Sequence, residues 1–208
     1  MRFTRFLSAM FALCASSAVS ATTISTLNYV VTESDPKFTN YPVEILISGA
    51  NSIANFDLAF AVGDGGPILG GNEAIAIRAI DYSTGTIFNG LPMLTNENPS
   101  LPSLSAISAG LTTNPATDRS ANGLLATIYL DLTGASLGNH ALSLNVQGLS
   151  GATNATLVPL NLEFQNGSLT INAVPEPCAF SIALLGGAGL AYFARSRCKP
   201  VLICVVRI

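Results

Sequence analysis

His140 is the only histidine of the 208-residue chain, so it is the first candidate for acid–base or metal chemistry. A Ser–His–Asp site would recruit such a residue, but we expect no Gly-x-Ser-x-Gly nucleophile turn to accompany it. A zinc site needs several histidine or cysteine ligands, and one histidine cannot provide them. Because His140 follows Gly138-Asn139, we expect it in a solvent-exposed turn.

Four aspartates, Asp57, Asp64, Asp81 and Asp131, are spread over separate predicted strands and turns. Acid–base catalysis needs two carboxyl groups that converge on one bond, and calcium needs several clustered oxygens. We therefore expect these carboxylates on the solvated surface. The chain is predicted to be no enzyme and to hold no metal ion or cofactor.

Tyrosines are the remaining side chains with a recognition chemistry. Tyr29, Tyr41, Tyr82 and Tyr129 would stack on sugar rings if they shared one exposed face. The chain has no tryptophan, which weakens the case for a sugar-binding platform. We expect these tyrosines at the edge of the core.

Alternation of apolar and polar residues dominates positions 22–173 and predicts β-strands. The clearest predicted strands cover residues 53–62 and 121–132. Further strands are expected at 24–32, 41–48, 74–82, 86–88, 104–109, 141–147 and 157–171. Eight or nine strands in one stretch of this length predict a single all-β domain, an antiparallel β-sandwich of Greek-key or jelly-roll type.

Turn residues separate the predicted strands. Residues 89–102 are rich in Asn, Pro and Gly and are expected to form a long loop. Asn166-Gly167 between two alternating runs predicts a β-hairpin. No amphipathic helix is expected in this region.

Charge and cysteine content exclude two classes of function. Residues 22–173 carry eleven acidic and three basic side chains, a net charge of about −8, while the whole chain is −3. Nucleic-acid binding is therefore disfavoured, since it requires Lys and Arg to neutralise phosphates. The same residues contain no cysteine, which excludes disulfides and thiol chemistry there.

The N-terminus has the pattern of a secretory signal peptide. Arg2 and Arg5 are followed by an apolar, small-residue stretch from Phe6 to Ala18. Val19 and Ala21 fit the small-x-small cleavage rule, so residues 1–21 are predicted to be removed.

The C-terminus combines three features in order. Val174, Pro175, Glu176 and Pro177 come first, an uncharged apolar run covers residues 178–194, and Arg195, Arg197 and Lys199 form a basic cluster. As a helix, the run would reach roughly 25 Å, the lower limit for crossing a bilayer. The basic cluster predicts that its end stays in the cytoplasm and that the body lies outside.

This tail, residues 174–199, resembles a PEP-CTERM sorting signal of the kind found on exported bacterial proteins. The resemblance implies recognition and processing by an exosortase, an inner-membrane protease. It also implies a path from the inner membrane, with the body in the periplasm, to the cell surface or extracellular matrix, where exopolysaccharide is a candidate partner. Residues 200–208 are an extension that such tails normally lack.

Two segments of the body, residues 43–60 and 123–132, resemble core strands of cohesin-like and carbohydrate-binding β-sandwich domains. Together the ends and the body predict an exported, non-enzymatic envelope or matrix protein. The alternative is a carbohydrate- or protein-binding module at the cell surface, with the loop at 89–102 as part of its binding surface.

Overall fold

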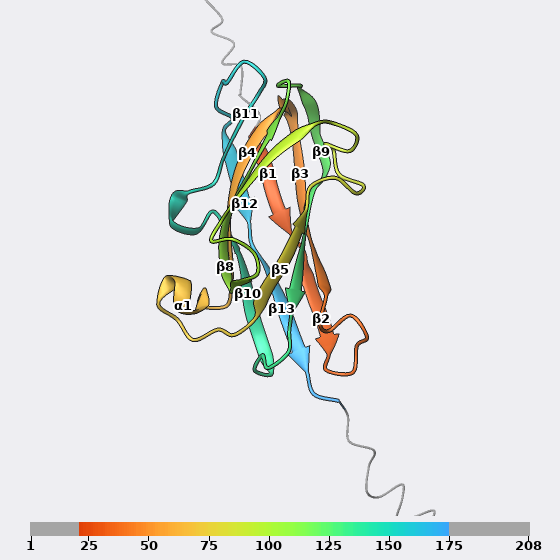
Figure 1. Ribbon diagram of the computed structural model, residues 1–208, viewed down its shortest axis with the longest axis vertical. Coiled ribbons are helices and arrows are strands. Elements are labelled where there is room, and N and C mark those ends of the chain that lie inside the picture. The colour runs from red at the N-terminus through yellow and green to blue at the C-terminus, as the bar shows by residue number, and fades with distance from the viewer. Residues whose placement is uncertain (1–20, 175–208) are drawn as a thin grey trace, which may run out of the picture.

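The computed structural model describes residues 21–174, which form two β-sheets packed face to face (Figure 1). The predicted signal peptide as far as residue 20, Pro175–Pro177 of the predicted sorting motif, the apolar run and the basic cluster lie outside the described residues. The six-stranded sheet has the order β12 (Leu162–Gln165), β1 (Thr22–Thr26), β3 (Tyr41–Ile53), β9 (Arg119–Asp131), β5 (Ala76–Asp81) and β7 (Ser103–Leu104).

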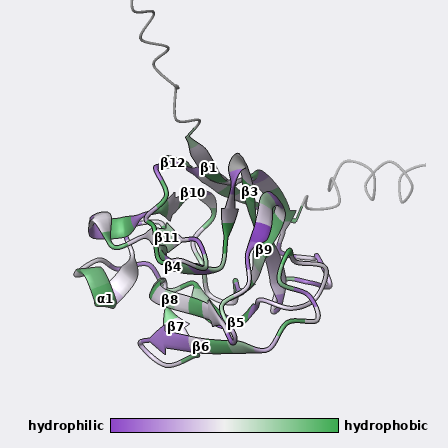
Figure 2. Ribbon diagram, turned by 90° about the horizontal axis from the view of Figure 1, so that it is seen from above, coloured by the Kyte–Doolittle hydropathy of each residue, from purple (hydrophilic) through white to green (hydrophobic). Residues whose placement is uncertain are grey.

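The seven-stranded sheet has the order β2 (Asn28–Thr32), β13 (Gly167–Asn172), β10 (Gly138–Leu144), β4 (Asn55–Val62), β8 (Ala106–Thr113) and β6 (Met93–Asn98), with β11 (Gly151–Thr153) also paired to β4. Two short helical turns complete the described chain, α1 (Gly66–Leu69) and η1 (Val146–Gly148). Figure 2, turned to look from above, shows α1 projecting on the side of β4 and β8.

The predicted β-sandwich is confirmed, and its core follows the alternation in the sequence. On β3, Val43, Ile45 and Ile47 are buried between the sheets. Glu44, which lies between two of them, and Ser48, which follows them, are exposed. Since successive residues of a strand face opposite sides, this pattern fixes which face each strand buries. The other buried apolar residues include Phe56, Leu58, Phe60, Ile77, Leu111, Ile128, Leu130, Leu142, Leu169 and Ile171.

The chain passes from one sheet to the other between β1 and β2, and again between β12 and β13. The predicted hairpin at Asn166-Gly167 is therefore wrong. β12 pairs with β1 in one sheet and β13 pairs with β2 in the other, both in parallel. The two segments that connect the sheets lie against each other: a Cβ added to Gly167 would lie 2.1 Å from the carbonyl oxygen of Leu27. Asn-Gly is used here for close main-chain approach and not for a tight turn.

Several predicted strand boundaries also change. The predicted strand at 53–62 is divided, because β3 ends at Ile53 in one sheet and β4 begins at Asn55 in the other. The predicted loop at 89–102 contains the edge strand β6, and the predicted strand at 86–88 is a turn. Divided strands, together with β6 and β11 where no strand was predicted, give thirteen strands among residues 21–174.

The described chain enters and leaves at opposite ends of the sandwich (Figure 1). β13 ends at Asn172, and the side chain of Val174, which starts the Pro-Glu-Pro motif, is 45% exposed. Among residues 21–174 no helix has the length and apolar character needed to cross a membrane.

Candidate functional site

His140 is buried, which corrects the prediction of an exposed turn. It lies near the start of β10, pairs with Leu169 of β13 and is 5% exposed. Its Nδ1 lies 2.5 Å from Oε2 of Glu73, and its Nε2 lies 2.9 Å from the carbonyl oxygen of Ser136. The pair ties the β4–β5 connection to the start of β10.

One Gly-x-Ser-x-Gly sequence, residues 134–138, does precede His140, so the expectation that none accompanies it is wrong. It lies in the connection between β9 and β10, whereas a nucleophile elbow lies between a strand and a helix. His140 contacts Ser136 through the main-chain carbonyl. A carbonyl only accepts hydrogen bonds, so Nε2 carries a hydrogen and has no lone pair with which to activate a hydroxyl.

Asp64 organises the connection that carries Glu73. Its carboxylate accepts hydrogen bonds from the main-chain N–H groups of Gly66, Asn72 and Glu73 at 2.8–2.9 Å. Hydrogen bonds from Asn72, Glu73 and Gly66 hold the pKa of Asp64 below its ordinary value, since they favour the charged form. Asp64 therefore has a structural role and holds the turn around α1.

The other aspartates do not converge on a common point. Asp131 is buried and pairs with Arg78. Burial raises the pKa of Asp131, but hydrogen bonds from Thr133 and Arg78 outweigh this effect and leave the pKa below its usual value. Asp81 accepts hydrogen bonds within its own turn, from Ser83 and Thr84. Within residues 21–174 no three acidic, histidine or cysteine side chains come close enough to hold a metal ion.

The tyrosines do not form an exposed platform. Tyr29 and Tyr41 pack edge to face with ring centroids 5.9 Å apart, and Tyr29 accepts a hydrogen bond from the main chain of Glu44. Tyr82 is 5% exposed and lies 6.0 Å from the ring of Phe56, in the core. Burial raises the pKa of Tyr82. Tyr29 and Tyr41, partly buried against the core, agree with the expected core-edge role, whereas Tyr82 lies within the core.

A mostly uncharged surface covers the outer face of β4, β8 and β6. The strand registers align it in rows: Asn55, Thr112 and Leu94; then Asp57, Gly110 and Asn96; then Ala59, Ser108 and Asn98. Residues directly opposite one another on antiparallel strands share a face, so these nine lie on one side of the sheet. Ala59 is buried there beside the segment after β10, and the other eight are exposed or half-buried. We call this surface the outer face. Asp57 is its single ionisable residue.

Apolar side chains border the outer face at one end. Ile68 and Leu69 of α1 are 42% and 37% exposed, and Leu149, which follows η1, is 56% exposed. Together with Ala59, Ser108 and Asn98 they line a hollow of about 260 Å³. Exposed apolar groups gathered beside one face of a sheet are a common feature of contact surfaces.

Local sequence explains the position of α1. Gly65 and Gly66 adopt left-handed backbone conformations, with φ of 79° and 55°, and Pro67 follows at the start of the helix. A Cβ on Gly66 would lie 2.5 Å from the carbonyl oxygen of Glu73. The sequence Asp64-Gly65-Gly66-Pro67 thus presents Ile68 and Leu69 beside the outer face.

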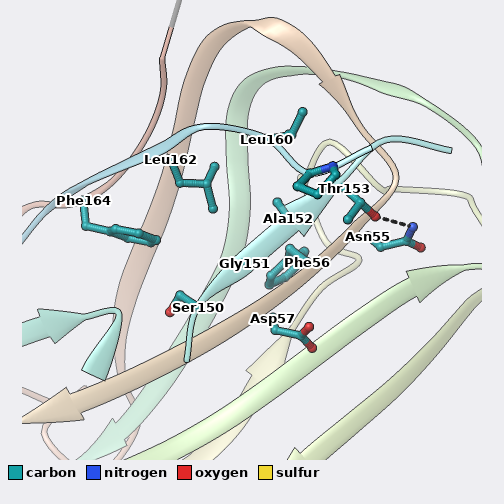
Figure 3. A pocket seen from close by; sticks show the side chains of 11 residues that line it. Asn55, Phe56, Asp57, Ser150, Gly151, Ala152, Thr153, Leu160, Leu162 and Phe164 are labelled. Atoms are coloured by element: carbon teal, nitrogen blue, oxygen red, sulfur yellow. Dashed lines mark hydrogen bonds between the residues drawn. The ribbon is translucent and has the colours of Figure 1, made fainter. Parts of the chain in front are cut away.

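A second hollow, of about 400 Å³, opens where β12 approaches β11 and β4 (Figure 3). Leu162 and Phe164 line it from β12, and Phe56 and Ala152 line it from the other sheet. Asn55 donates from Nδ2 to Oγ1 of Thr153 at its rim, at 3.0 Å. Sequence reasoning missed both hollows, because their linings come from segments far apart in the chain.

Comparison with known proteins supports the fold. No protein-family model and no curated protein matches the chain. A non-cellulosomal cohesin from Archaeoglobus fulgidus matches with a TM-score of 0.52 at 17% identity, over 77% of this chain and 96% of that one.

Two further matches are cohesins solved in complex with dockerins. The sixth cohesin of Acetivibrio cellulolyticus scaffoldin B matches at 14% identity and a TM-score of 0.53, over 73% of this chain and 99% of that one. A type I cohesin from Clostridium thermocellum matches at 10% identity and 0.52, over 73% and 99%. At these identities the similarity establishes a fold: residues 21–174 form a cohesin-like β-sandwich.

Proposed function

We propose that the chain is an exported, non-enzymatic protein whose β-sandwich binds another protein at the cell surface or in the extracellular matrix. The observation that carries this proposal is the outer face of β4, β8 and β6, which is exposed or half-buried except at Ala59, nearly uncharged and bordered by exposed apolar residues. The fold adds support, because cohesins of the same fold have been solved in complex with dockerins.

The composition of the outer face favours a protein partner over a sugar. Small side chains such as Ser108 and Gly110 leave the sheet flat, so a partner can approach the backbone closely. Ile68, Leu69 and Leu149 offer apolar area that leaves water on binding. No tyrosine belongs to the three rows, so aromatic stacking on sugar rings has no support there.

Photo-crosslinking tests the binding surface. We expect a photoreactive amino acid at Asn96 on the outer face to give one discrete adduct in the producing cells. The same residue at Ser48, exposed on the opposite sheet, serves as the matched control and should give none. Adducts of equal yield from both positions, or adducts to polysaccharide alone, would contradict a protein-binding outer face.

The tail is proposed to deliver this module. A signal peptide at residues 1–21 directs export, the run at 178–194 holds the precursor in the inner membrane, and an exosortase acts at Val174–Pro177. The exposure of Val174, two residues beyond the last strand, supports access of a protease to this point. The proline residues around Glu176 favour an extended segment that an enzyme can hold.

Replacing Glu176 with Ala, or deleting Pro175–Pro177, is expected to leave the full-length precursor in the inner membrane. Cell fractionation with immunoblotting measures this. Glu163→Ala removes an exposed carboxylate from β12 and is expected to mature as the wild type does. Normal processing and location of the Glu176 variant would refute recognition of the motif.

A further inference from the structure

Three Asn-Gly pairs occur in the described chain, at Asn89-Gly90, Asn122-Gly123 and Asn166-Gly167. In such a pair the main-chain nitrogen of the glycine can attack the Asn side chain, because glycine has no Cβ to hinder the approach. The attack requires a free side-chain amide and a backbone that can rearrange. The structure places the three pairs in very different surroundings.

In two of the pairs, the Asn side chain is hydrogen-bonded and the backbone of the Gly is restrained. Asn122 donates from Nδ2 to the carbonyl oxygen of Gly49 at 2.9 Å and accepts from the Gly49 N–H at Oδ1, while Gly123 is paired within β9. Oδ1 of Asn166 accepts a hydrogen bond from the Leu144 N–H at 2.8 Å. Gly167 lies against the Leu27 carbonyl, so its backbone has no room to move.

Asn89 and Gly90 are both exposed, in the connection between β5 and β6. The hydrogen bond found at Asn89 is from its main-chain N–H to Thr86, at 3.1 Å, and within residues 21–174 its side chain takes part in none. Gly90 has a φ of 77°, and a Cβ built on it would meet no atom within 4 Å. The side-chain amide is therefore free, and the glycine has open space around it.

We propose that Asn89 is a site of spontaneous deamidation in the folded protein. The Gly90 nitrogen loses its proton and bonds to Cγ of Asn89, and the bond from Cγ to Nδ2 breaks to release ammonia. The resulting succinimide takes up one water molecule. Opening at one carbonyl gives aspartate, and opening at the other gives isoaspartate, so one water is consumed for each ammonia released.

The modification would change a defined part of the fold. The preceding residue, Phe88, is fully buried and stacks on Phe56 with ring centroids 5.8 Å apart. The following residues lead into the edge strand β6. Either product adds a negative charge. Isoaspartate also adds one main-chain carbon between the buried Phe88 and β6.

Mass spectrometry of peptides from the purified protein, aged at mildly alkaline pH, tests the proposal. In the folded protein Asn89 is expected to convert faster than Asn122 and Asn166 by roughly tenfold or more, which corresponds to about 1.4 kcal/mol in barrier height. In urea the three sites are expected to react at similar rates, because the hydrogen bonds and strand pairing are lost. Fragmentation that separates isoaspartate from aspartate should find both products at position 89.

Asn89→Gln serves as the control variant, because its longer side chain disfavours ring closure. The exposed position leads us to expect unchanged folding by circular dichroism, and the conversion signal at residue 89 should vanish. Equal rates at all three sites in the folded protein would overturn the proposal. So would an Asn89 that is as strongly protected by folding as Asn122.

Discussion

Removing either member of the Glu73–His140 pair is expected to lower the free energy of unfolding by about 3–5 kcal/mol. The side chains of His140 and Glu73 are 6% and 9% exposed, and their polar atoms lie 2.5 Å apart. Glu73→Ala or His140→Ala leaves the remaining group buried without its hydrogen-bond partner. This cost is large beside the stability of a typical domain, about 5–15 kcal/mol.

Urea unfolding followed by circular dichroism measures the effect. Glu163→Gln changes an exposed carboxylate and should stay within about 0.5 kcal/mol of the wild type. The double variant Glu73→Met/His140→Leu removes both polar partners together and is expected to recover part of the loss, because neither buried group is then left unpaired. Single variants as stable as the Glu163→Gln control would show that the pair contributes nothing to the fold.

Alternating apolar residues were sufficient to predict the sandwich, because burial on one face of a strand leaves a period of two in the sequence. The run Phe56, Leu58, Phe60 and Val62 shows this, since all four are buried in the core. Ala59 and Ala61 on the opposite side are buried as well. The segment after β10 returns over β4, where Ser150 accepts a hydrogen bond from the Ala59 N–H.

Strand pairing was harder to predict than strand position. Asn166-Gly167 has the composition of a hairpin turn, but the chain passes there from one sheet to the other. The decisive contact is the approach of Gly167 to Leu27, which is 140 residues away in sequence and leaves no local pattern. The parallel pairing of the first and last strands has the same long-range origin.

The environment of His140 and the identity of the outer face also depend on distant residues. Burial of His140 is stabilised by Glu73, whose position follows from the turn that Asp64 holds. β6 was missed because Asn96, Asn98 and the nearby prolines are typical of loops. These polar residues suit an edge strand with one face in solvent, and they form part of the proposed binding surface.

Replacing Ser108 with Arg is expected to weaken partner binding by about a hundredfold or more, which corresponds to about 2.7 kcal/mol. Ser108 lies on the middle strand of the outer face, between Ala59 and Asn98. A long cationic side chain there would hold a flat partner away from the sheet and would bury its charge without a designed counter-ion. Ser48→Arg places the same side chain on the opposite sheet and is expected to bind as the wild type does.

Calorimetric titration of the wild type, Ser108→Arg and Ser48→Arg against the partner crosslinked from Asn96 tests the proposed binding face most directly. Circular dichroism should first establish that all three proteins are equally folded. The account predicts tight binding by the wild type and Ser48→Arg and a loss of affinity confined to Ser108→Arg. Undiminished binding by Ser108→Arg, or an equal loss in both variants, would contradict it.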